Sequence, residues 1–329
     1  MSITDLFFYK VNAMIFIIPN NFQKEGNSMK PNILQKGDTV GIISPSHVAT
    51  PERYRDIIFG IEALGLQVKT GKNLYKDTYG YLASEEERAE DLNTMASDEK
   101  VKMVFFGGGS GSVELLPLID YERIKKNPKI YLSYSDGTSI LNAICHKTGL
   151  ETYYGQAPGI FSDLRHYDYE QFVSHFLKGN VTDFQPNSPW VSICPGGCEG
   201  ILLGGYMLNF ALLVNSEFGG FDKAERYVLF LEDHEQFSDV AAVSMYLAHI
   251  EQSDFINNVS GLLFGHYSEK IHPELLERLS RFGSRHQVPV AYCDDFGHGK
   301  NHAVLPIGCK AVLNTNENRL SFSPEPHCQ

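Results

Sequence analysis

The fold of this chain is decided by the stretch Lys129-Ile130-Tyr131-Leu132-Ser133-Tyr134-Ser135-Asp136-Gly137-Thr138. Its apolar first half predicts a buried strand, and the segment 140–144 predicts a helix. Ser135 would then occupy the corner between strand and helix, where its hydroxyl leaves the sheet edge beside helix N-terminal amides, as in a nucleophile elbow. The pattern is Ser-x-Ser-x-Gly rather than Gly-x-Ser-x-Gly, so an alternative is that Ser135 or Asp136 only caps the helix.

The bulk composition limits the class of protein and of partner. The chain has 329 residues, of which 43% are apolar and 21% charged, and its formal net charge is -12. These values are ordinary for a soluble globular protein with one large or two medium domains. The negative charge and the lack of basic patches argue against a nucleic-acid partner, because phosphate neutralisation requires clustered cations.

The cysteines and the N-terminus bear on location. The six cysteines are spread along the chain without a zinc-finger or disulfide spacing, which is typical of free thiols, and we expect a cytoplasmic protein. The apolar run at 13–18 is too short to cross a bilayer and lacks a basic start, so we expect no membrane association. Residues 1–28 are predicted to be a misassigned upstream extension or a poorly ordered tail, because the chain from Met29 onward reads like an ordinary start.

Predicted strands and helices alternate along most of the chain, with two short β segments at the end. The predicted strands are 39–44, 66–70, 101–106, 226–231, 259–264, 288–293, 309–314 and 319–322. The predicted helices include 54–64, one that begins at 84, 167–177, 240–250 and 273–282. Such alternation indicates parallel sheets in an α/β fold. The segment 180–195 is rich in Pro, Ser and Asn, which predicts an N-terminal domain at 29–179, a linker at 180–197 and a C-terminal domain at 198–329.

A glycine-rich loop, Gly107 to Ser112, follows the predicted strand at 101–106. It lacks the Gly-Lys-Ser/Thr and Gly-x-Gly-x-x-Gly spacings of phosphate-binding loops. Its backbone N–H groups are better suited to stabilising a developing oxyanion. A tight strand-to-helix turn is the alternative.

Two more candidates follow predicted strands in the C-terminal half. Glu232 and Asp233 follow the strand at 226–231, at the strand end where ligand sites of α/β folds form. His298 lies between two glycines after the strand at 288–293 and could be a general base. An acid after a strand often caps a helix and a loop histidine is often solvated, so each is weak alone. With Ser135 they give the order Ser…Glu…His, and such triads are recognised by geometry rather than spacing.

Several ordered blocks of this chain resemble the LD-carboxypeptidase family of serine peptidases, which includes muramoyl-tetrapeptide carboxypeptidases and microcin-C immunity peptidases. The blocks are 36–39 through 44–46, 81–83 with Arg88 and 91–92, the glycine loop with 115–120, 128–136, 231–233 and 297–308. The resemblance extends from about Pro31 to about Phe322. It implies an N-terminal parallel-sheet domain, Rossmann- or flavodoxin-like, with a nucleophile elbow. It also implies a C-terminal α/β domain with a small β-barrel-like sheet.

The resemblance also implies a catalytic mechanism. Ser135 would be the nucleophile, His298 the general base, and Glu232 the residue that orients His298. The backbone N–H of Asp136 and that of Gly108 or Gly109 would form the oxyanion hole. The active site would lie in the cleft between the domains, without a metal or a cofactor, and the protein would form a homodimer.

The lining of the substrate pocket is less well defined. We expect Ser110, Tyr154 and Gln156 to lie near the substrate. The family commonly has Arg, Tyr and Arg at the positions of Gly107, Ser110 and Glu114, and a Gly-Gly-Asn block becomes Gly204-Gly205-Tyr206 here. The triad is unaffected by these departures, so the sequence defines the reaction class better than the substrate.

Three functions are consistent with these residues. The leading hypothesis is a cytoplasmic serine carboxypeptidase that cleaves an L,D-peptide bond and releases D-alanine from murein tetrapeptides during cell-wall recycling. The second keeps the triad but hydrolyses a peptidyl-nucleotide, with Trp190 as a candidate to stack on the base, although packing is the simpler role for Trp190. The third, suggested by the altered glycine loop, is a non-catalytic peptide-binding homologue.

Overall fold

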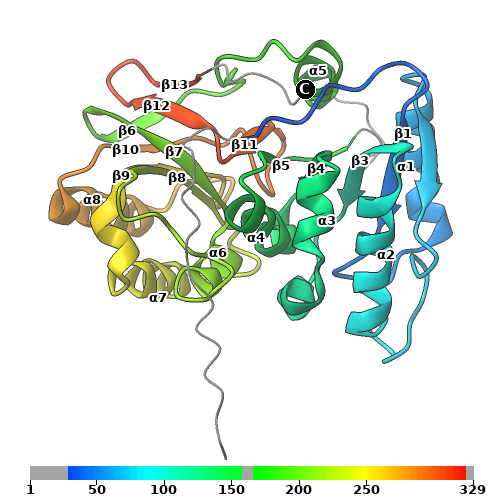
Figure 1. Ribbon diagram of the computed structural model, residues 1–329. Helices are drawn as coiled ribbons and strands as arrows, with labels where there is room; N and C mark the ends of the chain where they lie inside the picture. The colour runs from blue at the N-terminus through cyan, green and yellow to red at the C-terminus, as the bar shows by residue number, and fades with distance from the viewer. Residues whose placement is uncertain (1–28, 158–165, 324–329) are drawn as a thin grey trace, which may run out of the picture.

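The computed structural model describes residues 29–157 and 166–323, which form two β-sheets with helices packed around them (Figure 1). The predicted N-terminal extension, residues 1–28, lies outside the described residues. The strands are β1 (Thr39–Ile43), β2 (Gln67–Thr70), β3 (Val101–Phe106), β4 (Ile130–Ser133), β5 (Thr152–Tyr154), β6 (Val191–Cys194), β7 (Gly197–Tyr206), β8 (Tyr227–Glu232), β9 (Val259–Phe264), β10 (Val290–Tyr292), β11 (Leu305–Ile307), β12 (Lys310–Asn314) and β13 (Arg319–Phe322).

The helices lie between these strands, as the alternating pattern predicts. The α-helices are α1 (Pro51–Glu62), α2 (Glu85–Ser97), α3 (Tyr121–Lys126), α4 (Thr138–Thr148), α5 (His166–Phe172), α6 (Met207–Leu213), α7 (Val240–Glu251) and α8 (Pro273–His286). Short 3-10 helices lie at η1 (Ser112–Leu118), η2 (Ser135–Gly137) and η4 (Asp254–Asn258), and α5 continues as a π-helix at η3 (Val173–Lys178). The predicted α/β class is therefore confirmed.

The first sheet has the strand order β11-β5-β4-β3-β1-β2. Strands β1 to β5 are parallel, and β11 joins β5 in the antiparallel direction. The carboxyl ends of parallel strands meet at one edge of the sheet. Because β3 and β4 are neighbours, with Phe106 opposite Ser133, the glycine loop after β3 lies beside Ser135.

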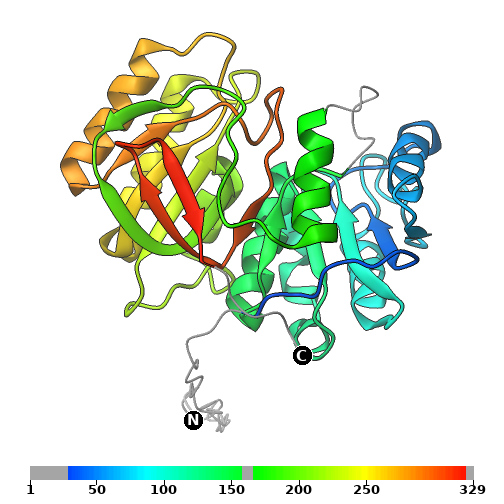
Figure 2. The same cartoon turned by 90° about the horizontal axis from the view of Figure 1, so that it is seen from above.

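The second sheet has the order β13-β12-β7-β8-β9-β10-β6 and curls into a half-barrel (Figure 2). Strands β7 to β10 are parallel, whereas β6, β12 and β13 are antiparallel additions at the two edges. The hairpin β12–β13, red in Figure 2, forms one edge of this sheet. Glu232 is the last residue of β8, so its side chain is presented at the carboxyl edge of the sheet.

The two sheets are not independent units, because strand β11 returns from the C-terminal half to the first sheet. Leu305 pairs with Tyr154 and Ile307 with Thr152. Hydrogen bonds from Asn142 Nδ2 to the Gly204 carbonyl oxygen and from the Tyr206 amide to Thr138 Oγ1, each 2.8 Å long, add further ties. One hydrophobic cluster also contains residues of both sheets, such as Phe106 and Leu202.

Some elements differ from the sequence prediction. The predicted linker contains β6, which pairs with β10, so it is not irregular throughout. Strand β7 was not predicted, since four of its ten residues are glycines and glycine disfavours strands. The boundaries at 179 and 198 stay a prediction. None of the helices in the described ranges is long and apolar enough to cross a membrane.

Candidate active site

Ser135 occupies the turn between β4 and α4 with a backbone φ of 54°. This left-handed conformation is uncommon for a non-glycine residue, and such strain concentrates at functional turns. The residues at the N-caps of η2 and α4 are Tyr134 and Gly137, and neither cap has a side-chain hydrogen bond. The interpretation of Ser135 or Asp136 as a simple helix cap is therefore wrong.

Ser135, His298 and Glu232 form one hydrogen-bonded chain, although they come from separate parts of the sequence. His298 Nε2 lies 2.9 Å from Ser135 Oγ, and His298 Nδ1 lies 2.9 Å from Glu232 Oε2. A carboxylate can only accept, so Nδ1 carries the proton and Nε2 is free to accept from the Ser135 hydroxyl. Such an arrangement can activate a serine for attack on an acyl group.

The loop that carries His298 is held against the buried Glu232. Gly297 has a φ of 85°, and a Cβ placed on it would lie 2.5 Å from Glu232 Cδ, so no larger residue fits there without a shift. Burial lowers the pKa of His298, but the charge and hydrogen bond of Glu232 more than offset this, and the pKa lies above its usual value of 6.5. The carboxylate therefore favours the imidazolium that forms when His298 takes a proton.

Asp136 anchors the glycine loop to the elbow. Its carboxylate accepts from the Ser112 amide at 2.8 Å and from Asn209 Nδ2 at 2.7 Å, and its carbonyl oxygen accepts from Ser112 Oγ at 2.6 Å. Gly108 lies against the nucleophile, since a Cβ on it would be 2.5 Å from Ser135 Cβ. Gly109 packs instead against the Ser46 carbonyl. Of the residues predicted for an oxyanion hole, Gly108 thus lies against Ser135 and Asp136 follows it in the chain, whereas Gly109 faces Ser46.

Glu114, at a position where the family commonly has arginine, forms an ion pair with Arg88. Arg88 is buried and donates to the carbonyl oxygens of Pro45 at 2.8 Å and Gly111 at 3.0 Å. Both of these bonds come from Nη1, whereas Nε donates to the Ala83 carbonyl oxygen at 3.0 Å and Nη2 pairs with Glu114 Oε2 at 2.5 Å. The carboxylate at this position therefore supports a buried cation that ties Gly111 of the glycine loop to Pro45 in the segment after β1, a role that a second arginine could not fill.

The three residues predicted to line the substrate pocket are placed differently from one another. Ser110 is exposed on the glycine loop, where its amide donates to the Ser46 carbonyl at 2.8 Å. Tyr154 and Gln156 are buried. The Tyr154 hydroxyl donates to Glu232 Oε1 and accepts from the Ser135 amide at 2.9 Å, so it is directed toward the residues of the proposed triad.

Aromatic rings that the sequence reasoning did not assign to the site surround His298. The ring centroids of Phe237, Tyr206 and Tyr134 lie 5.1, 5.2 and 6.2 Å from that of His298. Phe237 is 59% exposed. The only available signal was the tyrosine that replaces asparagine in the Gly-Gly-Asn block. Trp190, by contrast, is buried against Phe184, so packing is its role in the structure.

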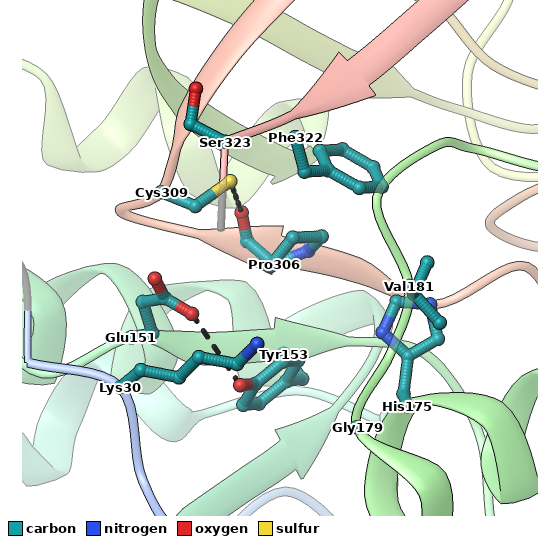
Figure 3. Close-up of a pocket in the computed structure, with 10 residues that line it drawn as sticks. All are labelled: Lys30, Glu151, Tyr153, His175, Gly179, Val181, Pro306, Cys309, Phe322 and Ser323. Atoms are coloured by element: carbon teal, nitrogen blue, oxygen red, sulfur yellow. Dashed lines mark hydrogen bonds between the residues drawn. The ribbon is translucent and has the colours of Figure 1, made fainter. Parts of the chain in front are cut away.

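Two cavities of the structure lie away from the triad. A cavity of about 20 Å³, sufficient for one water, lies near β5 and β11 and is lined by Lys30, Glu151, Tyr153, His175 and Cys309 among others (Figure 3). A groove of about 620 Å³ lies beside α5 and includes Asn187 and Asn301. Within the described ranges, no group of three or more His, Cys, Asp or Glu side chains is arranged to hold a metal ion.

Comparison with known proteins assigns the family. The family model described as the LD-carboxypeptidase N-terminal domain matches residues 40–155, and that of the LD-carboxypeptidase C-terminal domain matches residues 199–313. The chain belongs to the LD-carboxypeptidase family. Its members are peptidases, so the chain is a peptidase and hence a hydrolase, as the resemblance implied.

Individual relatives of this chain are similar to it over most of their length. A Bacillus subtilis protein named "Probable murein peptide carboxypeptidase" is 32% identical over 88% of this chain and 92% of its own. The Escherichia coli microcin C7 self-immunity protein MccF is 26% identical over 89% of this chain and 95% of its own. A crystal structure of an MccF-like protein from Bacillus anthracis is 25% identical, with a TM-score of 0.78 over 91% of this chain and all of that one.

Proposed function

We propose that this member of the LD-carboxypeptidase family is a serine carboxypeptidase that cleaves the L,D-peptide bond before a C-terminal D-alanine in murein tetrapeptides. The observation that carries the proposal is the hydrogen-bonded chain from Ser135 through His298 to Glu232, with Ser135 at a strained elbow. The murein peptide name of the relative with 32% identity supports the substrate class.

The reaction is an acyl transfer. His298 Nε2 takes the proton of the Ser135 hydroxyl while Oγ attacks the scissile carbonyl carbon. When the C–N bond breaks, the same nitrogen gives that proton to the amine of the departing D-alanine. Water, deprotonated by His298, then attacks the acyl-enzyme and frees the shortened peptide and Ser135. Glu232 holds the Nδ1 proton and stabilises each imidazolium that forms.

The negative charge of the tetrahedral intermediate requires donors near Ser135. We assign this role to the Asp136 amide with that of Gly108 or Gly109, because the elbow and the glycine loop meet there. Hydrogen bonds from Ser112 and Asn209 hold the Asp136 side chain and support a fixed orientation of its backbone. Preformed donors of this kind stabilise an oxyanion without reorganisation.

The alternatives have weaker support. A peptidyl-nucleotide hydrolase shares the triad and has a relative in MccF, but the buried Trp190 is not placed to stack on a base. A non-catalytic binding protein would not need a histidine within 2.9 Å of both the serine and the acid. Formation of a homodimer and a cytoplasmic location stay predictions.

The decisive experiment measures D-alanine released from L-Ala-D-Glu-meso-diaminopimelate-D-Ala by mass spectrometry. We expect release by the native protein, none by Ser135→Ala, and near-native release by Ser133→Ala, whose buried hydroxyl bonds the Phe106 carbonyl instead of His298. Release that persists in Ser135→Ala would refute this nucleophile. No release by the native protein, together with cleavage of an aminoacyl sulfamoyl-adenylate, would favour the nucleotide alternative.

A further inference from the structure

We propose that Tyr154 is a fourth member of the triad's hydrogen-bond chain, a positioning residue that links Glu232 to the backbone of the nucleophile. This inference rests on the proposed function, since it concerns the same three residues. The Tyr154 side chain lies at the end of β5 and is completely buried. Its hydroxyl contacts Glu232 Oε1 on one side and the Ser135 amide, at 2.9 Å, on the other.

The chemistry of the two partners fixes the direction of both hydrogen bonds. A backbone amide can only donate and a carboxylate can only accept, so the phenol accepts from Ser135 and donates to Glu232. Burial, followed by the nearby Glu232 charge, raises the pKa of Tyr154 well above its usual value of 10.0. The phenol therefore stays protonated and remains a donor at every pH at which His298 titrates.

In this arrangement each oxygen of the Glu232 carboxylate has a different partner. One oxygen faces the Tyr154 hydroxyl and the other faces His298 Nδ1, so the carboxylate plane is fixed and His298 is held in one tautomer. Removing the phenol would leave a fully buried carboxylate oxygen without this donor. It would also concentrate the negative charge on the side of His298.

The same hydroxyl constrains the nucleophile. Ser135 has a φ of 54°, and its amide is engaged by Tyr154 rather than directed at substrate. The Ser135 amide is thus not part of the oxyanion hole, which depends on the Asp136 and glycine-loop amides. The hydrogen bond to Tyr154 instead holds the strained elbow, because such conformations persist only where their surroundings fix them.

The test is the variant Tyr154→Phe, which keeps the ring that packs against Phe230 at a centroid distance of 5.7 Å. We expect kcat to fall about 10- to 100-fold, the equivalent of one hydrogen bond to a charged group. We also expect the acid limb of the kcat/KM profile to move to higher pH, because the unshared charge of Glu232 stabilises the His298 imidazolium more strongly.

The matched control is Tyr153→Phe, the neighbouring tyrosine of β5. Its hydroxyl is directed to Glu151 Oε2, at 3.5 Å, in the small cavity away from the triad (Figure 3). This variant is expected to keep the native pH profile. If Tyr154→Phe folds and matches the native kcat and profile, or loses activity without any shift of the profile to higher pH, the positioning role is wrong.

A second readout separates this proposal from the proposed substrate. A fluorophosphonate probe phosphonylates an activated serine as fluoride leaves, and its labelling rate needs no peptide. If the native protein is labelled at Ser135 but releases no D-alanine, the substrate assignment fails, and the labelling rates of Tyr154→Phe against pH still test the role of Tyr154. Slower labelling, with the acid limb of its pH profile at higher pH, supports the role of Tyr154. An unchanged labelling rate and pH profile overturn that role.

Discussion

At the scale of single residues, the contact with Glu232 sets the direction in which the pKa of His298 is shifted. The neighbouring Glu232 raises the pKa of His298 despite its burial. Only the neutral imidazole can accept the Ser135 proton, so activity should rise with pH as His298 loses its proton. We therefore predict that the acid limb of native kcat/KM lies above pH 6.5, the usual histidine value. A limb at or below this value would contradict the prediction.

The variant Glu232→Gln tests the cause of that pKa. The amide has no charge to favour imidazolium, so we expect the limb to move to lower pH, opposite to the shift expected for Tyr154→Phe. We also expect kcat to fall about 10⁴-fold, because an amide can hold His298 in the wrong tautomer. Glu235→Gln is the control, since Glu235 is an exposed carboxylate in the loop after β8 that faces His272 at 3.1 Å. A similar loss in both variants would exclude a specific role of Glu232.

At the scale of elements, α6 holds the elbow from the other half of the molecule. Asn209 of α6 donates to the Asp136 carboxylate at 2.7 Å and to Ser139 Oγ at 2.8 Å. We predict that Asn209→Ala lowers the free energy of unfolding by about 1.5–3 kcal/mol, because it removes a donor from a buried charged group. Chemical denaturation measures this change. The exposed Asn215, just after α6, is the control, and Asn215→Ala should change stability by less than about 0.5 kcal/mol.

The individual elements also show which parts of the fold could be predicted from the sequence. Strands such as β3 and β9 have long apolar runs and were predicted with their observed bounds. Strand β7 was missed because its glycines conceal the pattern, and β11 because three residues before a turn carry no periodicity. Ser135, Glu232 and His298 were proposed from strand ends and the family resemblance, and the structure brings them into hydrogen-bond contact. The aromatic rings of Tyr206 and Phe237 were not, since only tertiary packing brings them to His298.

At the scale of the whole molecule, the two sheets share one hydrophobic cluster and are joined by β11. We predict that the protein unfolds in a single cooperative transition, with the calorimetric and van't Hoff enthalpies equal. Differential scanning calorimetry measures both. Two resolved transitions, one for each sheet, would contradict the prediction.

A core variant extends this test. Leu305 of β11 is completely buried in the shared cluster. We predict that Leu305→Ala lowers the free energy of unfolding by about 2–5 kcal/mol through lost burial and a residual cavity. The whole transition should move to lower temperature without splitting, because the residue stabilises both sheets. The exposed Val312→Ala is the control, and a loss of comparable size there would show that burial at β11 is not the cause.

The pairing of β5 with β11 also has a consequence for synthesis on the ribosome. Tyr154 meets Leu305, which lies about 150 residues later in the chain. At a translation rate of about 5–20 residues per second, the edge of β5 stays uncovered for on the order of 10 s after it emerges. During that interval the nascent chain presents an open strand edge, which can pair with other chains. Ser135 is then already synthesised, but His298 is not. Under the proposed function, the site is therefore complete only after β11 and the loop of His298 have been synthesised.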